Sequence, residues 1–137
     1  MGQELDALYI ATAHRVDLMG IEALSRAEYV LMSVWYAVGM VGTRGFAGYF
    51  EKRMPLAELS DTLCAISAFP AAQVVERLRL VVGPSERMTE GDRVMATVVA
   101  SLEAEFRKWI PGITRELASY VAREGVPAGR APDANPA

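Results

Sequence analysis

The chain has little of the chemistry that marks metal sites or disulfides. Its 137 residues include one cysteine, Cys64, and one histidine, His14. A single cysteine excludes an internal disulfide, which favours a reducing compartment and predicts a cytoplasmic protein. One cysteine and one histidine are also too few for a zinc site built from these two residue types. No cofactor is expected.

Long apolar runs and an excess of basic charge are missing as well. The longest uncharged stretch lies between Glu28 and Arg44, and it is shorter than the roughly 20 residues of a membrane span. The first ten residues carry Glu4 and Asp6 but no basic residue, unlike a secretory signal. With 17 acids against 14 bases, the chain also lacks the basic footprint of a nucleic-acid binder. We expect neither a membrane nor a direct nucleic-acid partner.

What the sequence has in abundance is helical periodicity. Apolar residues make up 52% of the chain, which excludes wholesale disorder. They recur at spacings of three and four, and alternation with a period of two never persists. The pattern predicts an all-α, single-domain bundle of about six or seven helices over residues 1–124. Residues 125–137 are rich in proline, glycine and alanine and are predicted to form a flexible tail.

Local signals predict where helices begin and end. Ser25 and Glu28 form a capping box at the start of the second helix. Pro55 and Pro70 suit the first turns of two further helices. Pro111 is expected to end the long helix before it or to open the last one.

The segment from Trp35 to Arg53 is the least ordinary part of the chain. It has a glycine at every third position from 39 to 48, interspersed with aromatic residues. The second helix is expected to end near Val41 or Gly42, with a turn and a short helix from Gly45 onward. A phosphate-binding loop is disfavoured, because no strand precedes the glycines and their spacing is not GxGxxG. The segment is instead predicted to be a hinge within the core.

Two interpretations of the side chains in this segment remain open. In one, the aromatic residues anchor the core. In the other, aromatic and basic side chains form a patch for a partner. The residues of that predicted patch are Arg44, Phe46, Tyr49, Lys52 and Arg53.

Acidic residues supply a second candidate surface. Residues 1–43 contain five acids against two bases, an excess that could face a basic partner. A protein that imitates DNA would need these acids and two further along the chain to form one dense face. The residues of that predicted acidic face are Glu4, Asp6, Asp17, Glu22, Glu28, Glu58 and Asp61.

Catalysis has one weak candidate. His14 could act as a general base oriented by Asp17, three residues on, but no nucleophile is identifiable near them. Cys64 lies beside an apolar stripe and is expected to be a buried structural thiol. Glu103 and Arg107 are expected to form a weak ion pair on the solvent side of a helix.

One stretch resembles a known family. Residues 43–52, TRGFAGYFEK, are similar to the motif Asn-Gly-Gly-Phe/Leu-x-Gln-Tyr/Phe-Phe-x-Asn of a bacterial family of small helical proteins best known for a DNA-mimic protein. The likeness covers roughly residues 25–110. Four positions agree with the motif and four depart from it. The matching residues are Gly45, Phe46, Tyr49 and Phe50, and the departures are Thr43, Arg44, Gly48 and Lys52.

The resemblance implies an all-helical, dimeric, non-enzymatic protein that acts through protein contacts. The function predicted first is therefore a non-catalytic protein-binding module, an immunity or antitoxin-type inhibitor of a toxin or another protein. A DNA-mimic regulator that occupies a DNA-binding protein is the alternative, and a small enzyme using His14 and Asp17 is the third. A homodimer is predicted through a second apolar face on the second helix. That face comprises Tyr29, Met32, Tyr36 and Met40.

Overall fold

The elements of the chain are all helical in the part that the computed structural model describes, which comprises residues 2–50, 55–84, 86 and 91–127. The predicted all-α class is confirmed. The count differs, because these ranges hold five α-helices and one short 3-10 helix rather than six or seven helices. In chain order they are α1 (Gly2–Met19), η1 (Ile21–Ala23), α2 (Arg26–Tyr49), α3 (Leu56–Ala65), α4 (Phe69–Val82) and α5 (Arg93–Glu124).

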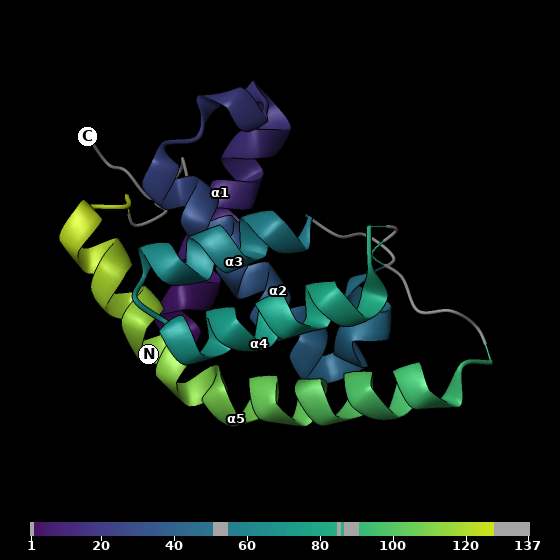
Figure 1. The fold of residues 1–137 in the computed structure, drawn as a ribbon. Coiled ribbons are helices and arrows are strands. Elements are labelled where there is room, and N and C mark those ends of the chain that lie inside the picture. Colours follow the sequence, from purple (N-terminus) through teal and green to yellow (C-terminus); the bar gives the residue numbers. More distant parts are fainter. Residues whose placement is uncertain (1, 51–54, 85, 87–90, 128–137) are drawn as a thin grey trace, which may run out of the picture.

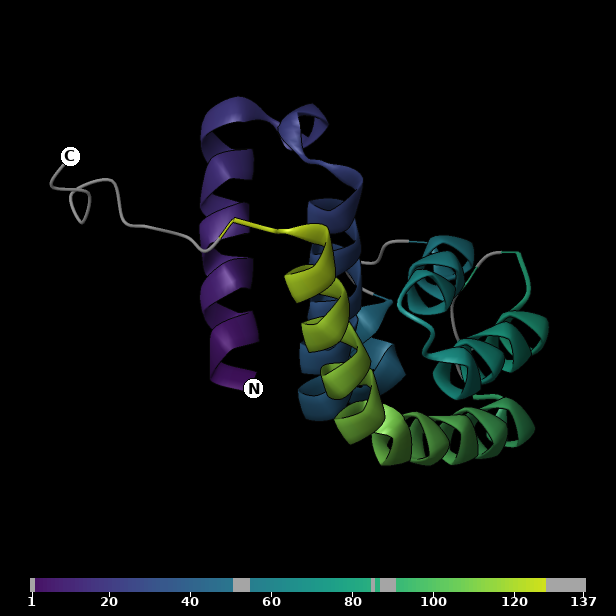
Figure 2. The ribbon, with the colours of Figure 1, turned by 90° about the vertical axis from the view of Figure 1, so that its left-hand side faces the viewer.

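Two helices continue through positions where a break was expected. α2 does not end at Val41 or Gly42 but runs to Tyr49, with its only non-helical backbone at Gly45. α5 likewise continues through Pro111, and Figures 1 and 2 show it changing direction midway. A proline inside a helix removes one backbone bond and kinks the helix, but packing on both sides can offset that cost.

The starts predicted from Ser25 and Pro70 are confirmed, and α5 begins at a cap that was not predicted. The Ser25 hydroxyl accepts a hydrogen bond from the Glu28 N–H at 3.2 Å, and the Glu28 carboxylate accepts one from the Ser25 N–H at 2.9 Å. Asp92 caps α5 by accepting from the Met95 N–H at 2.9 Å. Pro70 lies in the first turn of α4. At the far end, α5 stops at Glu124, where the helical domain was predicted to finish; residues 128–137 of the predicted tail lie outside the described residues.

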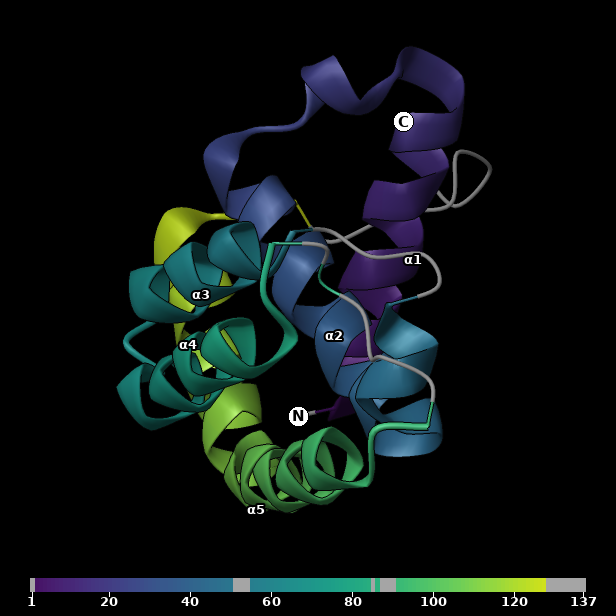
Figure 3. The ribbon, with the colours of Figure 1, turned by 45° about the vertical axis from the view of Figure 1, so that its right-hand side comes forward.

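The helices are arranged around α2. Figure 1 shows α3 and α4 above the first half of α5, and Figure 2 shows the second half of α5 rising beside α2. α1 stands at one edge, next to α2 and away from α3 and α4, and Figure 3 shows the same separation from another side.

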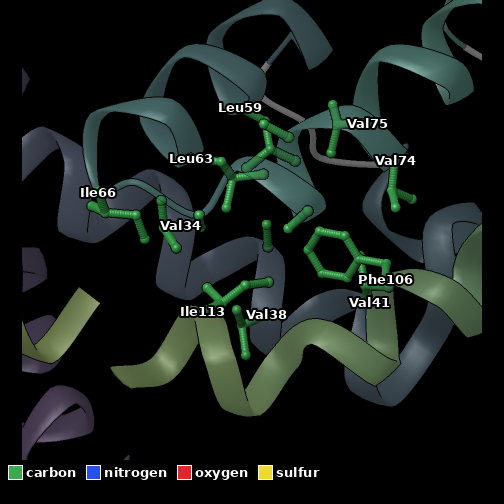
Figure 4. Packing of buried hydrophobic residues seen from close by; sticks show 14 of the residues in the cluster. Val34, Val38, Val41, Leu59, Leu63, Ile66, Val74, Val75, Phe106 and Ile113 are labelled. Carbon is green, nitrogen blue, oxygen red and sulfur yellow. The ribbon is translucent and has the colours of Figure 1, made fainter. Parts of the chain in front are cut away.

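One continuous core joins α2, α3, α4 and α5. Figure 4 shows Val34, Val38 and Val41 of α2 directed toward residues of the other three helices. α3 and its C-cap contribute a row of residues with helical spacing to this core, since Leu56, Leu59, Leu63 and Ile66 are all buried. α1 contributes least to this core, because Leu5 and Thr12 are its only fully buried residues.

Candidate functional site

The glycine–aromatic segment contains a sharp backbone break at Gly45. This residue has φ 72° and ψ −176°, a conformation that only glycine adopts readily. A Cβ atom at this position would also lie 2.2 Å from Glu103 Oε1. The predicted hinge is therefore present, at one residue rather than over a turn of three.

Side chains of α5 bind the backbone that this break exposes. The Phe46 N–H donates to Glu103 Oε1 at 2.8 Å, whereas in an unbroken helix it would donate to the carbonyl of Gly42. Arg107 donates to the Val41 carbonyl from Nε at 3.3 Å and from Nη2 at 3.1 Å. The Arg107 Nη1 also lies 3.3 Å from Glu103 Oε2. The predicted ion pair between Glu103 and Arg107 is therefore present, and it has a further role that was not predicted, because its two side chains also satisfy polar groups on both sides of the kink.

The aromatic residues after the kink belong to the core. Phe46 and Tyr49 are both 0% exposed, and the Phe46 ring meets Phe106 edge-on at 5.5 Å. Burial raises the pKa of the Tyr49 hydroxyl. Phe46 and Tyr49 are therefore not available to a partner, and the interpretation in which they anchor the packing holds.

The basic edge of the predicted patch is only partly described. Arg44 is exposed on α2, and its side chain lies against Gly48, where a Cβ atom would come within 2.4 Å of Arg44 Cβ. Lys52 and Arg53 lie outside the described residues. Of the five predicted patch residues, Arg44 therefore lies at the surface, and Phe46 and Tyr49 lie in the core.

The predicted acidic face loses one member to the interior. Glu28 is 6% exposed, and its carboxylate pairs with the Arg15 guanidinium while also closing the capping box. Its assignment to a surface face is wrong, because the charge is neutralised inside the contact between α1 and α2. Asp6 and Glu58 are exposed but accept hydrogen bonds from Trp35 Nε1, at 2.7 Å, and from the Tyr29 hydroxyl.

The remaining acids do not form one dense face. Asp6 and Asp17 are eleven residues apart on α1, about 16 Å along the helix axis. Glu58 and Asp61 belong to α3, which α2 separates from α1 in Figure 2. Asp61 and Glu22 are both exposed, but Asp61 belongs to α3 and Glu22 to η1, which follows α1.

The residues of the catalytic hypothesis lie on the outer side of α1. His14 and Asp17 are both exposed, one turn apart on the same helix. In the described ranges, no group of three or more histidine, cysteine, aspartate or glutamate residues is placed to share a metal ion.

Cys64 is exposed, which contradicts the prediction of a buried thiol. With Phe69, which is 54% exposed, it lines a surface pocket of about 530 Å³ between α3 and α4. The other residues of the lining are Ser60, Ala72, Gln73, Glu76 and Arg77.

The predicted dimer face on α2 is largely used within the molecule. Tyr29, Met32, Tyr36 and Met40 are half-buried, and Tyr36 and Met40 pack against the core. Tyr29 also donates to Glu58 of α3 and lies under the Arg26 guanidinium.

A surface that the sequence reading missed lies on α1 and η1. Ile10 is 67% exposed, Leu18 70%, Met19 68% and Ile21 56%. Ile10 and Leu18 lie away from the side of α1 that carries the buried Leu5 and Thr12, whereas Met19 lies at the end of the helix and Ile21 in η1. The sequence contains this signal, because at 3.6 residues per turn Ile10 and Leu18 fall about 120–160° around the helix from Leu5 and Thr12.

A groove between α1 and the end of α5 adjoins this surface. It has a volume of about 380 Å³ and is lined mainly by small apolar residues. Its lining consists of Glu4, Leu5, Ala7, Leu8, Ala118, Val121, Ala122 and Val126.

None of the helices in the described ranges has the length and apolarity needed to cross a membrane. The resemblance to the DNA-mimic family remains a prediction, because the chain matches no family model, no curated protein and no solved structure.

Proposed function

We propose that this chain is a non-catalytic protein-binding module that neutralises a protein partner, in the manner of an immunity or antitoxin-type inhibitor. One observation carries the binding part of the proposal: four large apolar side chains are more than half exposed on α1 and η1. Ile10 and Leu18 lie on one side of α1, and an exposed apolar surface of this kind often marks an interaction site. The inhibitory part rests on the family resemblance.

The acid distribution gives the DNA-mimic alternative little support. A mimic needs carboxylates spaced along one face, whereas Glu28 is paired internally and the acids of α1 and α3 lie on different sides of α2. The enzymatic alternative has only the neighbouring positions of His14 and Asp17 in its favour.

The proposal is tested by capture from cells that express the genes adjacent to this one. Purified protein immobilised through its C-terminus should retain one of those gene products in a stoichiometric complex, and that product's activity should fall when the complex forms. Recovery of this chain alone, at protein concentrations of tens of micromolar, would refute the proposal.

A further inference from the structure

The outer face of α1 carries a row of exposed residues with helical spacing, which are apolar except for His14. Ala7, Ile10, His14 and Leu18 follow one another at intervals of three, four and four residues, and all four are exposed. Leu5 and Thr12, which are buried against the rest of the molecule, lie on the opposite side of the same helix. We call these four residues the α1 stripe.

Carboxylates flank the α1 stripe on both sides. With 3.6 residues per turn, Glu4 falls about 80° to one side of His14, while Asp17 falls about 60° and Asp6 about 80° to the other. All three are exposed. The only cation of α1, Arg15, is paired with Glu28 and does not offset them. The surface therefore has an apolar centre and acidic margins.

The groove between α1 and α5 extends the apolar surface sideways. Ala7 belongs to both features, and Ala118 and Ala122 of α5 form the far wall of the groove. Small residues allow a docked helix to approach closely. Glu4 is the only charged residue in the lining, so the groove has the same sign of charge as the margins of the stripe.

We propose that α1 binds a basic amphipathic helix of the partner protein. This inference rests on the proposed function and names the part of the partner that is recognised. Apolar residues of the incoming helix at positions i, i+3 or i+4, and i+7 pack on Ile10, His14 and Leu18. Lysine or arginine residues beside that apolar row then face Glu4 on one side and Asp6 and Asp17 on the other.

A second copy of this chain fits the surface less well. Pairing α1 with another α1 would bring two sets of acidic margins together, and like charges at an interface cost free energy. Charge complementarity therefore selects a basic partner helix over self-association.

The first test uses designed peptides and isothermal titration calorimetry. The probe is an 18-residue leucine–lysine peptide with leucines at helical spacing. It should bind with a dissociation constant in the micromolar range, which corresponds to a binding free energy of about −8 kcal/mol or weaker. A leucine–glutamate peptide of the same pattern, and a serine–lysine peptide of the same charge, should both fail to bind. Binding of the leucine–lysine peptide should weaken as salt is raised from 50 to 500 mM.

Matched variants locate the binding surface. The double variant Ile10→Ser, Leu18→Ser should weaken peptide binding about tenfold or more. The control variant Leu80→Ser, Val94→Ser removes side chains that are 85% and 75% exposed on α4 and α5, away from α1, and should bind like the wild type. Circular dichroism spectra and melting curves check that both variants fold.

Three results would overturn the inference. The control variant could lose binding as much as the α1 variant, or the serine–lysine peptide could bind as well as the leucine–lysine peptide. Sedimentation velocity could instead reveal a dimer of the free protein that the Ile10→Ser, Leu18→Ser variant abolishes, which would assign the α1 stripe to self-association.

Capture with the α1 variant separates this inference from the proposed function. A wild-type protein that retains a neighbouring gene product, together with an α1 variant that does not, supports both. Equal capture by the two refutes the α1 site but leaves the protein-binding function intact. Failure of the wild type to capture any partner refutes the proposed function itself.

Discussion

At the scale of single residues, Gly45 determines the path of α2. Its φ of 72° lies where a side chain is strained, and its close approach to Glu103 leaves no room for a Cβ atom. Gly39 is the useful contrast, since it lies in the same helix, is exposed, and has no atom within 4 Å of a Cβ built there. Two glycines of one repeat therefore have different roles.

Substituting each of these glycines by alanine should change stability in opposite directions. Gly45→Ala should lower the free energy of unfolding by about 2–4 kcal/mol, from backbone strain and a displaced Glu103. Gly39→Ala should raise it by about 0.5–1 kcal/mol, because alanine favours helix. Urea unfolding followed by circular dichroism measures both. Equal effects at the two positions would contradict the assigned role of Gly45.

A second prediction concerns the Tyr29 hydroxyl. Partial burial and then the hydrogen bond to Glu58 raise its pKa from 10.0 to about 12. The unfolded chain loses this proton near pH 10, whereas the folded chain keeps it until about pH 12, so Tyr29 makes the free energy of unfolding fall as pH rises through that interval. Glu58→Ala should move the pKa back toward 10, as measured by carbon NMR of the tyrosine ring. Asp61→Asn, on the same helix, is the control and should leave the Tyr29 pKa where it is.

Sequence reasoning at this scale succeeded where the interactions are local. The Ser25–Glu28 capping box was predictable because both bonds join residues three apart. The exposure of Cys64 and the bonds of Glu103 were not, because each depends on which helix lies next to the residue. Periodicity identifies the inward face of a helix but does not say what covers its flanks.

At the scale of elements, the contact between α2 and α5 combines apolar packing with a polar joint. The Phe46 ring packs on Phe106. Glu103, three residues before Phe106, and Arg107, the residue after it, bond the broken backbone of α2. The kink and the two charged residues therefore depend on each other, since a buried unpaired N–H group is costly.

Removing Glu103 should be more damaging than removing a neighbouring acid. Glu103→Ala leaves the Phe46 N–H without an acceptor and should lower the free energy of unfolding by about 1–3 kcal/mol. Glu105→Ala breaks only an exposed pair with Arg77, at 2.8 Å, and should cost at most about 1 kcal/mol. Denaturant unfolding of both variants provides the comparison. If Glu103→Ala lowered the free energy of unfolding no more than Glu105→Ala does, the bonds of Glu103 to α2 would contribute little to stability.

Element boundaries show the same division between local and tertiary causes. Gly83 and Asp92 mark the end of α4 and the start of α5 because their effect is confined to neighbouring residues. Pro111 and Gly42 did not end a helix, because tertiary packing supports both helices. α5, which contains Pro111, packs against α2 and α4, and α2, which contains Gly42, packs against α5. Single-sequence signals predict breaks, but tertiary packing decides which of them are realised.

At the scale of the whole molecule, α1 is anchored by fewer buried residues than any other α-helix in the described ranges. It buries two residues completely, while α2 buries many more in the common core. The Arg15–Glu28 ion pair and the hydrogen bond from Trp35 to Asp6 add polar contacts between α1 and α2. The surface proposed to bind a partner thus lies on the helix with the weakest apolar anchorage.

This difference predicts that α1 opens separately from the rest of the fold. In native-state hydrogen exchange, amides of α1 should exchange with a lower opening free energy than those of α2 and α5. Arg15→Met leaves the Glu28 carboxylate buried without its partner, which costs about 3–5 kcal/mol in comparable cases. Opening of α1 exposes that carboxylate to water, so the variant should speed exchange in α1 much more than in α3 and α4.

A second substitution on the same background isolates the charge. Adding Glu28→Gln to Arg15→Met removes the unpaired charge but keeps an acceptor for the Ser25 N–H, so α1 should recover part of its protection. A uniform acceleration in all five helices would show instead that α1 unfolds together with the core. Partner binding would then stabilise the whole fold, and not α1 alone, against exchange.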